Sequence, residues 1–164
     1  MTAVTALEHD LRVVLPRLSV QARAIVDALL LSGGSIGSAT RVAERLGLPS
    51  RFALGRMLRR QGLPGLRELA AWVSLLDWVI LTEHSQAPLF AIATHARRNP
   101  AVCYRTVKRL TGLTWAQLKG RGSRWVLRQF IARCRAIRTG RRAPAIGRHG
   151  LATVNRSATS LPAW

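Results

Sequence analysis

Apolar residues recur every three or four positions through most of the chain, which is the spacing of amphipathic helices. Glycines and prolines interrupt this pattern at short intervals and mark turns. The pattern predicts helices over residues 21–32, 38–46, 50–61, 65–84, 88–97, 100–111, 114–119 and 123–138. No segment favours a strand, so we expect an all-α protein. Residues 1–20 are expected to form an N-terminal arm, and residues 139–164 a disordered basic tail because they mix Gly, Pro, Ser and Ala with arginines.

The helix over residues 65–84 is apolar on most of its surface. One stripe and much of the remaining surface are formed by Leu66, Leu69, Trp72, Val73, Leu75, Leu76, Trp78, Val79 and Ile80. A helix of this kind is usually buried in the middle of a domain. At a rise of about 1.5 Å per residue it is about 30 Å long. We therefore expect a central helix that joins two halves of the protein. The alternative is an exposed tryptophan-rich face, formed by Trp72 and Trp78, through which the chain would bind a partner as an adaptor.

A weak internal repeat relates the two halves. Two basic triplets lie 49 residues apart, and in each the residues at i, i+3 and i+4 share one helix face: Arg56, Arg59 and Arg60 in the first copy, and Arg105, Lys108 and Arg109 in the second. The opposite face of each helix is apolar. Gly62 and Gly112 follow 50 residues apart and can serve as left-handed helix caps.

Each basic helix is preceded by a short helix and a tight turn, which is the order of a helix-turn-helix motif. We therefore divide the chain into a first helix-turn-helix unit (21–63), a linker helix (64–84) and a second unit with an added C-terminal helix (85–138). The helices 50–61 and 100–111 would be the recognition helices, which enter the major groove of DNA.

The charge distribution indicates a polyanionic partner. The net charge is +19, and arginine outnumbers lysine 24 to 2. All seven acidic residues lie at or before Glu83, so residues 84–164 carry a net charge of +16. Arginine suits bidentate recognition of phosphate and guanine. A half without carboxylates cannot supply a two-metal nuclease site.

Several classes of protein are disfavoured. The N-terminus lacks the basic region of a signal peptide, and the apolar stretch from Leu69 to Leu81 is shorter than the roughly 20 residues of a membrane span. We expect a cytoplasmic, nucleoid-associated protein with reduced Cys103 and Cys134, and no membrane partner. The cysteines and histidines lack zinc-site spacing, no phosphate loop follows a strand, and no cluster suggests an organic cofactor.

The segments AERLGL (43–48), SRFALGRMLRR (50–60) and RTVKRLTGLT (105–114) resemble the DNA-binding domain of AraC-type (AraC/XylS) transcription regulators. The resemblance covers about residues 21–120. It implies two helix-turn-helix units joined by a long central helix, sequence-specific binding to double-stranded DNA, and transcriptional control with RNA polymerase as a further partner. The recognition helices would lie in successive major grooves about 34 Å apart. Only about 20 residues precede the first unit, so we expect no small-molecule effector domain in this chain.

Two sets of DNA contacts follow from these positions. The residues expected to read bases are Arg51, Arg56, Ala101 (through a thymine methyl group) and Arg105. The residues expected to hold the DNA backbone are Ser50, Arg59, Arg60, Arg97, Arg98, Asn99, Lys108, Arg109, Arg124 and Arg128. Ser50 is also expected to cap its helix, and the added C-terminal helix to cap the core of the second unit.

Two alternatives stay open. The first is an architectural protein that coats nucleic acid without sequence preference; aromatic residues make up only 5% of the chain and fall mostly in predicted cores, so base stacking is poorly supported. The second is a basic helical protein at a membrane surface. An enzyme is disfavoured: His95 and Arg98 match a His-x-x-Arg fragment of tyrosine recombinases, but the single tyrosine, Tyr104, lies on a helix that the repeat already explains.

Overall fold

The computed structural model describes residues 18–140, which form eight helices and no strand. The helices are α2 (Val20–Leu31), α3 (Ala39–Arg45), α4 (Arg51–Arg60), α5 (Leu66–Ser85), α6 (Leu89–His95), α7 (Pro100–Thr111), α8 (Trp115–Lys119) and α9 (Gly122–Arg138). Every helix predicted from the apolar spacing is present, and its ends differ from the prediction by two residues at most. The all-α fold is thus confirmed. Residues 1–17 of the expected arm (1–20) and residues 141–164 of the expected tail (139–164) lie outside the described residues.

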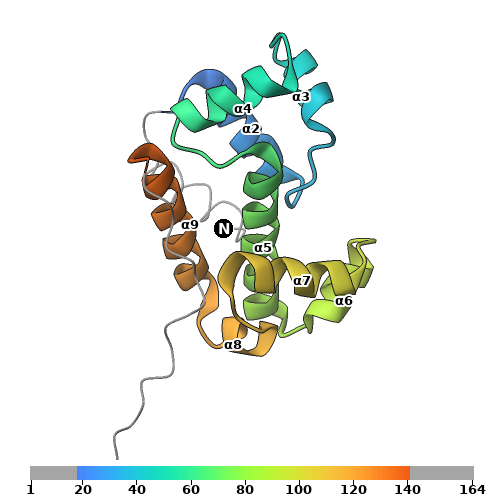
Figure 1. Cartoon of the computed structure of the whole chain (residues 1–164). Helices are drawn as coiled ribbons and strands as arrows, with labels where there is room; N and C mark the ends of the chain where they lie inside the picture. The colour runs from blue at the N-terminus through green and yellow to red at the C-terminus, as the bar shows by residue number, and fades with distance from the viewer. Residues whose placement is uncertain (1–17, 141–164) are drawn as a thin grey trace, which may run out of the picture.

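Helix α5 is the central element of the molecule. Helices α2, α3 and α4 lie around its N-terminal end, and α6, α7 and α8 around its C-terminal end (Figure 1). Trp72 and Trp78 are only 2% and 3% exposed. The buried central helix is therefore confirmed, and the alternative of a tryptophan-rich docking face on this helix is wrong.

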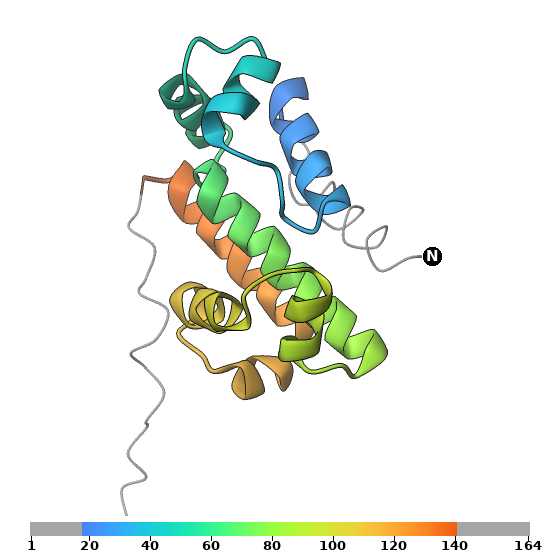
Figure 2. The ribbon, with the colours of Figure 1, turned by 90° about the vertical axis from the view of Figure 1, so that its right-hand side faces the viewer.

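Helix α9 lies antiparallel to α5 along its length, as Figure 1 and Figure 2 both show. Phe130 packs against Trp72 with ring centroids 5.9 Å apart. Arg133 of α9 donates two hydrogen bonds to the carboxylate of Glu68 at the start of α5, at 2.7 and 3.1 Å. The end of α9 reaches the first unit, where the Arg138 side chain lies against Gly62. Helix α9 therefore spans both units, whereas we expected it to cap only the second.

The internal repeat extends to the two turns that precede α4 and α7. In each turn, the backbone N–H after the left-handed residue donates to a buried alanine carbonyl: Leu48 to Ala43 at 2.9 Å, and Arg98 to Ala93 at 2.8 Å. The left-handed residues are Gly47 (φ 66°) and Arg97 (φ 52°). Backbone of this hand favours glycine, because a β-carbon crowds the following carbonyl. The pairs α3–α4 and α6–α7 thus share one turn geometry.

The Ser50 cap of α4 and the glycines after α4 and α7 agree with the expectations from sequence, whereas the Asn99 cap of α7 was not predicted. Ser50 Oγ accepts a hydrogen bond from the Ala53 N–H at 3.2 Å, and Asn99 Oδ1 accepts one from Ala101 at 2.9 Å. Gly62 and Gly112 follow the two helices with φ of 74° and 70°. These left-handed glycines end the helices as predicted. The capping side chains fix where each basic helix begins.

A cluster of side chains ties the two units to α5, and we call it the Arg98 junction (Gly33, Ser74, Trp78 and Arg98). The Arg98 guanidinium donates to Ser74 Oγ at 3.1 Å and to the Gly33 carbonyl at 2.9 Å. Ser74 Oγ also donates to the Gly33 carbonyl at 3.0 Å, and the guanidinium lies 5.8 Å from the centre of the Trp78 ring. The junction therefore joins the turn after α2, the middle of α5 and the turn before α7.

The burial of Asp77, which lies beside this junction, predicts that the stability of the fold depends on pH. Burial raises the pKa of its carboxyl group, and the charge of Arg98 lowers it by a smaller amount. The folded state therefore binds the Asp77 proton more tightly than the unfolded chain does. This group favours folding most below its unfolded pKa, near 3.8, and that contribution is lost as pH rises through the folded pKa.

We expect Asp77→Asn to gain stability relative to the wild type as the pH rises from 3 to 7. Urea denaturation at several pH values, followed by circular dichroism, measures this difference. A difference that stays constant over the whole range would assign the effect of the substitution to hydrogen bonding rather than to the buried charge.

Candidate nucleic-acid interface

Helix α4 has one buried and one cationic face. Leu54 and Leu58 point into the core and are almost completely buried. The exposed residues of the helix are Arg51, Phe52, Arg56, Arg59 and Arg60. Phe52, Arg56 and Arg59 lie at i, i+4 and i+7, so they form one outward stripe. The predicted basic face of the first unit is therefore free of the core.

Helix α7 repeats this arrangement. Cys103 and Val107 are buried, together with Thr111 at the end of the helix. The exposed residues include Ala101, Tyr104, Arg105, Lys108 and Arg109. Four of these lie at i, i+3, i+4 and i+7 from Ala101, which makes them a second outward stripe. Arg56 and Arg105 occupy equivalent positions in the two stripes, 49 residues apart.

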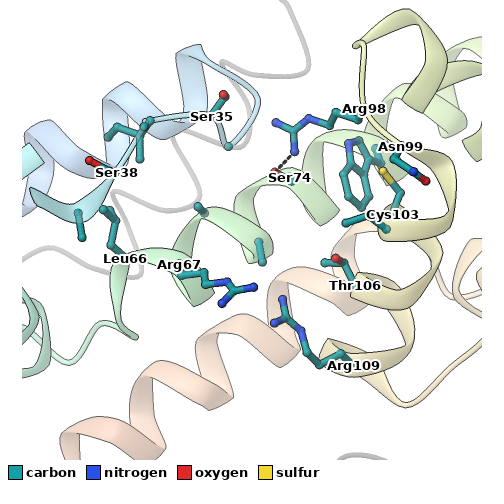
Figure 3. A pocket seen from close by; sticks show the side chains of 18 residues that line it. Ser35, Ser38, Leu66, Arg67, Ser74, Arg98, Asn99, Cys103, Thr106 and Arg109 are labelled. Atoms are coloured by element: carbon teal, nitrogen blue, oxygen red, sulfur yellow. Dashed lines mark hydrogen bonds between the residues drawn. The ribbon is translucent and has the colours of Figure 1, made fainter. Parts of the chain in front are cut away.

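A groove lies between the two units, and we call it the interunit groove. Its larger part, of 760 Å³, is bordered by the segment before α3, by α5 and by the turn and helix of the second unit (Figure 3). An adjoining part, of 530 Å³, is lined by residues of α4, α5 and α7. The two parts share Ala39, Leu66, Arg67 and Arg109. Both basic helices therefore border one continuous groove.

Arginines dominate the charge of the interunit groove. Arg67 and Arg109 point toward one another across it from α5 and α7 (Figure 3), and Arg51 lines its smaller part. Glu68 is the one acidic residue among those that line the groove, and its two carboxylate oxygens already accept hydrogen bonds from Arg133. Three exposed guanidinium groups therefore face the groove with one carboxylate that is already paired.

Arg98 departs from the role predicted for it. We expected it to hold a DNA phosphate in the turn before α7, but its guanidinium points inward and forms the Arg98 junction. A side chain in a turn was assumed to be free because turns lie at the surface, and the partly buried hydrogen bonds to Ser74 and Gly33 show that this one is not. We therefore remove Arg98 from the proposed backbone contacts.

The remaining predicted residues keep their surface positions. Arg97 and Asn99 are exposed in the same turn, and Asn99 also caps α7. Ser50 is half-buried at the N-terminus of α4. Arg124 and Arg128 are exposed on α9, one turn apart, and are not among the residues that line the interunit groove. They form a separate pair of predicted backbone contacts.

Three residues of this surface escaped the sequence analysis. Arg67 was overlooked because it is the only lysine or arginine on a helix that is apolar on most of its surface. The aromatic residues were placed mostly in predicted cores, and Phe52 and Tyr104 were not named as part of the basic surface, yet they are 65% and 41% exposed. Their positions at i−4 and i−1 from Arg56 and Arg105 place them in the outward stripes, so helical spacing alone could have found them.

The recombinase-like residues do not form one site. His95 and Arg98 line a separate cavity of 620 Å³ beside Asp77, and Tyr104 is not among its lining residues. Burial raises the pKa of the Cys103 thiol, which the charge of Arg98 partly offsets, and raises that of Cys134 to about 12. Both thiols are therefore protonated at neutral pH, in contrast to the thiolate of a reactive cysteine.

The described region, residues 18–140, contains no group of three or more His, Cys, Asp or Glu residues placed to hold a metal ion. None of its helices has the length and hydropathy that crossing a membrane requires.

The chain matches no family model, no curated protein and no solved structure. A functional proposal therefore rests on the geometry of this interface.

Proposed function

We propose that this chain is a sequence-specific, double-stranded DNA-binding transcription regulator, with α4 and α7 as two recognition helices in successive major grooves. The observation that carries the proposal is the pair of equivalent cationic stripes on α4 and α7, two helices that border one groove. Helices α4 and α7 lie on the same side of α5 (Figure 2). A duplex lying against that side meets both helices at once. This is the arrangement that the resemblance to AraC-type regulators implies.

The chemistry of the stripes suits direct reading of bases. Arg56 and Arg105 are exposed at equivalent points of the two helices, where a helix in the major groove presents its side chains to base edges. An arginine fork can donate two hydrogen bonds to O6 and N7 of a guanine. Arg51 and Ala101, near the helix starts, complete the proposed base contacts, with Ala101 against a thymine methyl group.

The other exposed cations suit the sugar-phosphate backbone. The proposed backbone contacts are Ser50, Arg59, Arg60, Arg97, Asn99, Lys108, Arg109, Arg124 and Arg128. Contacts of this kind set the position of the protein on the duplex and carry little sequence information. Control of transcription through RNA polymerase and residence on the nucleoid belong to the same proposal.

A second candidate function is the coating of nucleic acid without sequence preference. The exposure of Phe52 and Tyr104 within the two cationic stripes favours it, because single-strand binders combine basic surfaces with aromatic rings on which bases stack. The Arg51 guanidinium already lies over the Phe52 ring, 4.9 Å from its centre. A base that stacks on Phe52 must therefore displace this cation or take the opposite face of the ring.

Selection from random duplex DNA by the full-length chain separates the two functions. The regulator predicts one enriched motif with two half-sites about one helical turn apart. Binding to the enriched duplex should also weaken with salt, with a slope of about −0.9 per phosphate neutralised. Tight, salt-sensitive binding with no enriched motif would support the coating function instead, and a preference for single strands would point to stacking on Phe52 and Tyr104.

Arg56→Ala and Arg105→Ala are expected to relax the sequence preference at different half-sites. Each substitution removes a proposed bidentate contact that is worth about 1–3 kcal/mol of discrimination against the wrong base. Selection repeated with each variant locates the base pairs whose preference is lost. Arg23→Ala on α2, outside the two proposed recognition helices, removes the same charge and serves as the control. Equal weakening at all positions by both variants would show that these arginines contact phosphates only.

A further inference from the structure

The interunit groove contains a cation that the proposed recognition helices do not explain. Arg67 is the second residue of α5, it is exposed, and it lines both parts of the groove. We propose that Arg67 and Arg109 form a phosphate-binding site in this groove, and that its occupant is a backbone phosphate of duplex DNA between the two half-sites. This inference rests on the proposed function and adds a specific site to it.

The two guanidinium groups come from two different helices. Arg67 lies in the first turn of α5, and Arg109 lies in the last turn of α7. The neighbours of Arg67 on its own helix, Leu66 and Leu69, are buried, so the backbone that carries Arg67 is held by the core. A contact from a fixed helix loses less conformational freedom on binding than one from a flexible arm.

The electrostatics of the groove favour an anion. Arg67 and Arg109 point toward one another (Figure 3), and no carboxylate lines the larger part of the groove. Like charges that face one another repel unless an anion lies between them. The nearby Glu68 is held by Arg133 through two hydrogen bonds and is not free to pair with them. Guanidinium forks match the paired oxygens of a phosphate group, whereas a neutral ligand would leave these charges unbalanced.

The position of the groove identifies the source of the phosphate. A duplex that places successive major grooves on α4 and α7 must pass its backbone between the two helices, where the groove lies. A free phosphorylated compound would offer the same oxygens, but it would not need a site open to both basic helices. The DNA backbone is therefore the occupant that the placement supports.

Arg67→Gln tests the site in the full-length chain, with Arg23→Gln on α2 as the charge-matched control. On the selected duplex, we expect Arg67→Gln to weaken binding about tenfold and to reduce the salt slope by about 1. The enriched motif should stay the same, because a phosphate contact carries no base information. Arg67 is exposed, so circular dichroism melts of the variant and the wild type should coincide; Arg109→Gln is the second variant if they do not.

Single methylphosphonate substitutions in the duplex identify the contact directly. One uncharged linkage between the half-sites should weaken wild-type binding and should cause no further loss in Arg67→Gln. Equal losses in both proteins at every position, or an Arg67→Gln variant that binds like Arg23→Gln, would overturn the site and leave the proposed function intact. If the wild type binds no duplex, the proposed function and the site fall together.

Inorganic phosphate tests whether the groove binds a free phosphate compound instead of the DNA backbone. If millimolar phosphate raises the melting temperature of the wild type but not of Arg67→Gln, and duplex binding is equal in the two proteins, the groove binds free phosphate and the DNA assignment is wrong. If phosphate raises the melting temperature of neither protein, and one uncharged linkage weakens binding of the wild type but not of Arg67→Gln, the DNA backbone is supported as the occupant.

Discussion

Replacing Gly34 by alanine is expected to lower the free energy of unfolding by about 3–4 kcal/mol, a loss at the large end of single substitutions. Gly34 is buried in the turn between α2 and α3, with φ of 84°. A β-carbon at this position would lie 2.0 Å from Ser74 Oγ and 2.6 Å from the Ala70 carbonyl oxygen. The turn touches the backbone of α5 here, so an added methyl group must push the first unit away from the central helix.

The displacement would also break the Arg98 junction. Ser74 Oγ donates to the carbonyl of Gly33, the residue before Gly34, and accepts from the Arg98 guanidinium. Moving this turn therefore separates partly buried polar groups from their partners, which adds to the steric cost. The second unit should become less firmly oriented relative to the first, because Arg98 comes from the turn that begins α7.

Gly37→Ala is the matched control for this prediction. Gly37 lies in the same connection and has a φ of 80°, but a β-carbon there would meet nothing within 4 Å. Gly37→Ala should lower the free energy of unfolding only by the cost of the left-handed backbone conformation, about 1–2 kcal/mol. Urea denaturation followed by circular dichroism measures both variants. Equal losses for the two would show that backbone hand, and not the close approach to α5, determines the need for glycine at position 34.

The sequence predicted local structure well because the helices depend on short-range patterns. Apolar spacing located all eight helices of the described region, and the caps at Ser50 and Gly112 followed from their residue types. The Gly33-Gly34 pair lies between two predicted helices, where glycines mark a turn. Its contact with Ser74 was not predicted, because this contact joins residues about 40 positions apart that share no sequence pattern.

The candidate site was predicted in part. The two basic stripes followed from spacing along single helices, and their positions agree with the structure. Arg98 was expected at the surface, but its guanidinium is hydrogen-bonded inside the molecule. Arg67 was not considered, yet it lines the groove. Which arginine faces outward depends on how the units pack on α5, and no feature within one helix determines that.

Phe130→Ala is expected to lower the free energy of unfolding by about 3–5 kcal/mol, the usual cost of deleting a buried phenylalanine side chain. Phe130 is 1% exposed and packs against Trp72, the largest of the fully buried side chains, so the deletion opens a cavity between α9 and α5. The Trp72 indole N–H has no hydrogen-bond partner within the described residues, so water that enters this cavity could pair with it and reduce the loss. Leu127→Ala, at a half-buried position one turn earlier on α9, should cost clearly less.

The same variant tests whether α9 holds the two units together. Helix α9 pairs with the start of α5 through Arg133 and reaches Gly62 of the first unit through Arg138. If this contact fixes the relative orientation of α4 and α7, Phe130→Ala should weaken binding to a duplex with both half-sites more than binding to a single half-site, at temperatures where circular dichroism shows a folded chain. Equal weakening on both duplexes would mean that α5 alone sets the orientation, since the helices would then keep their spacing without the support of α9.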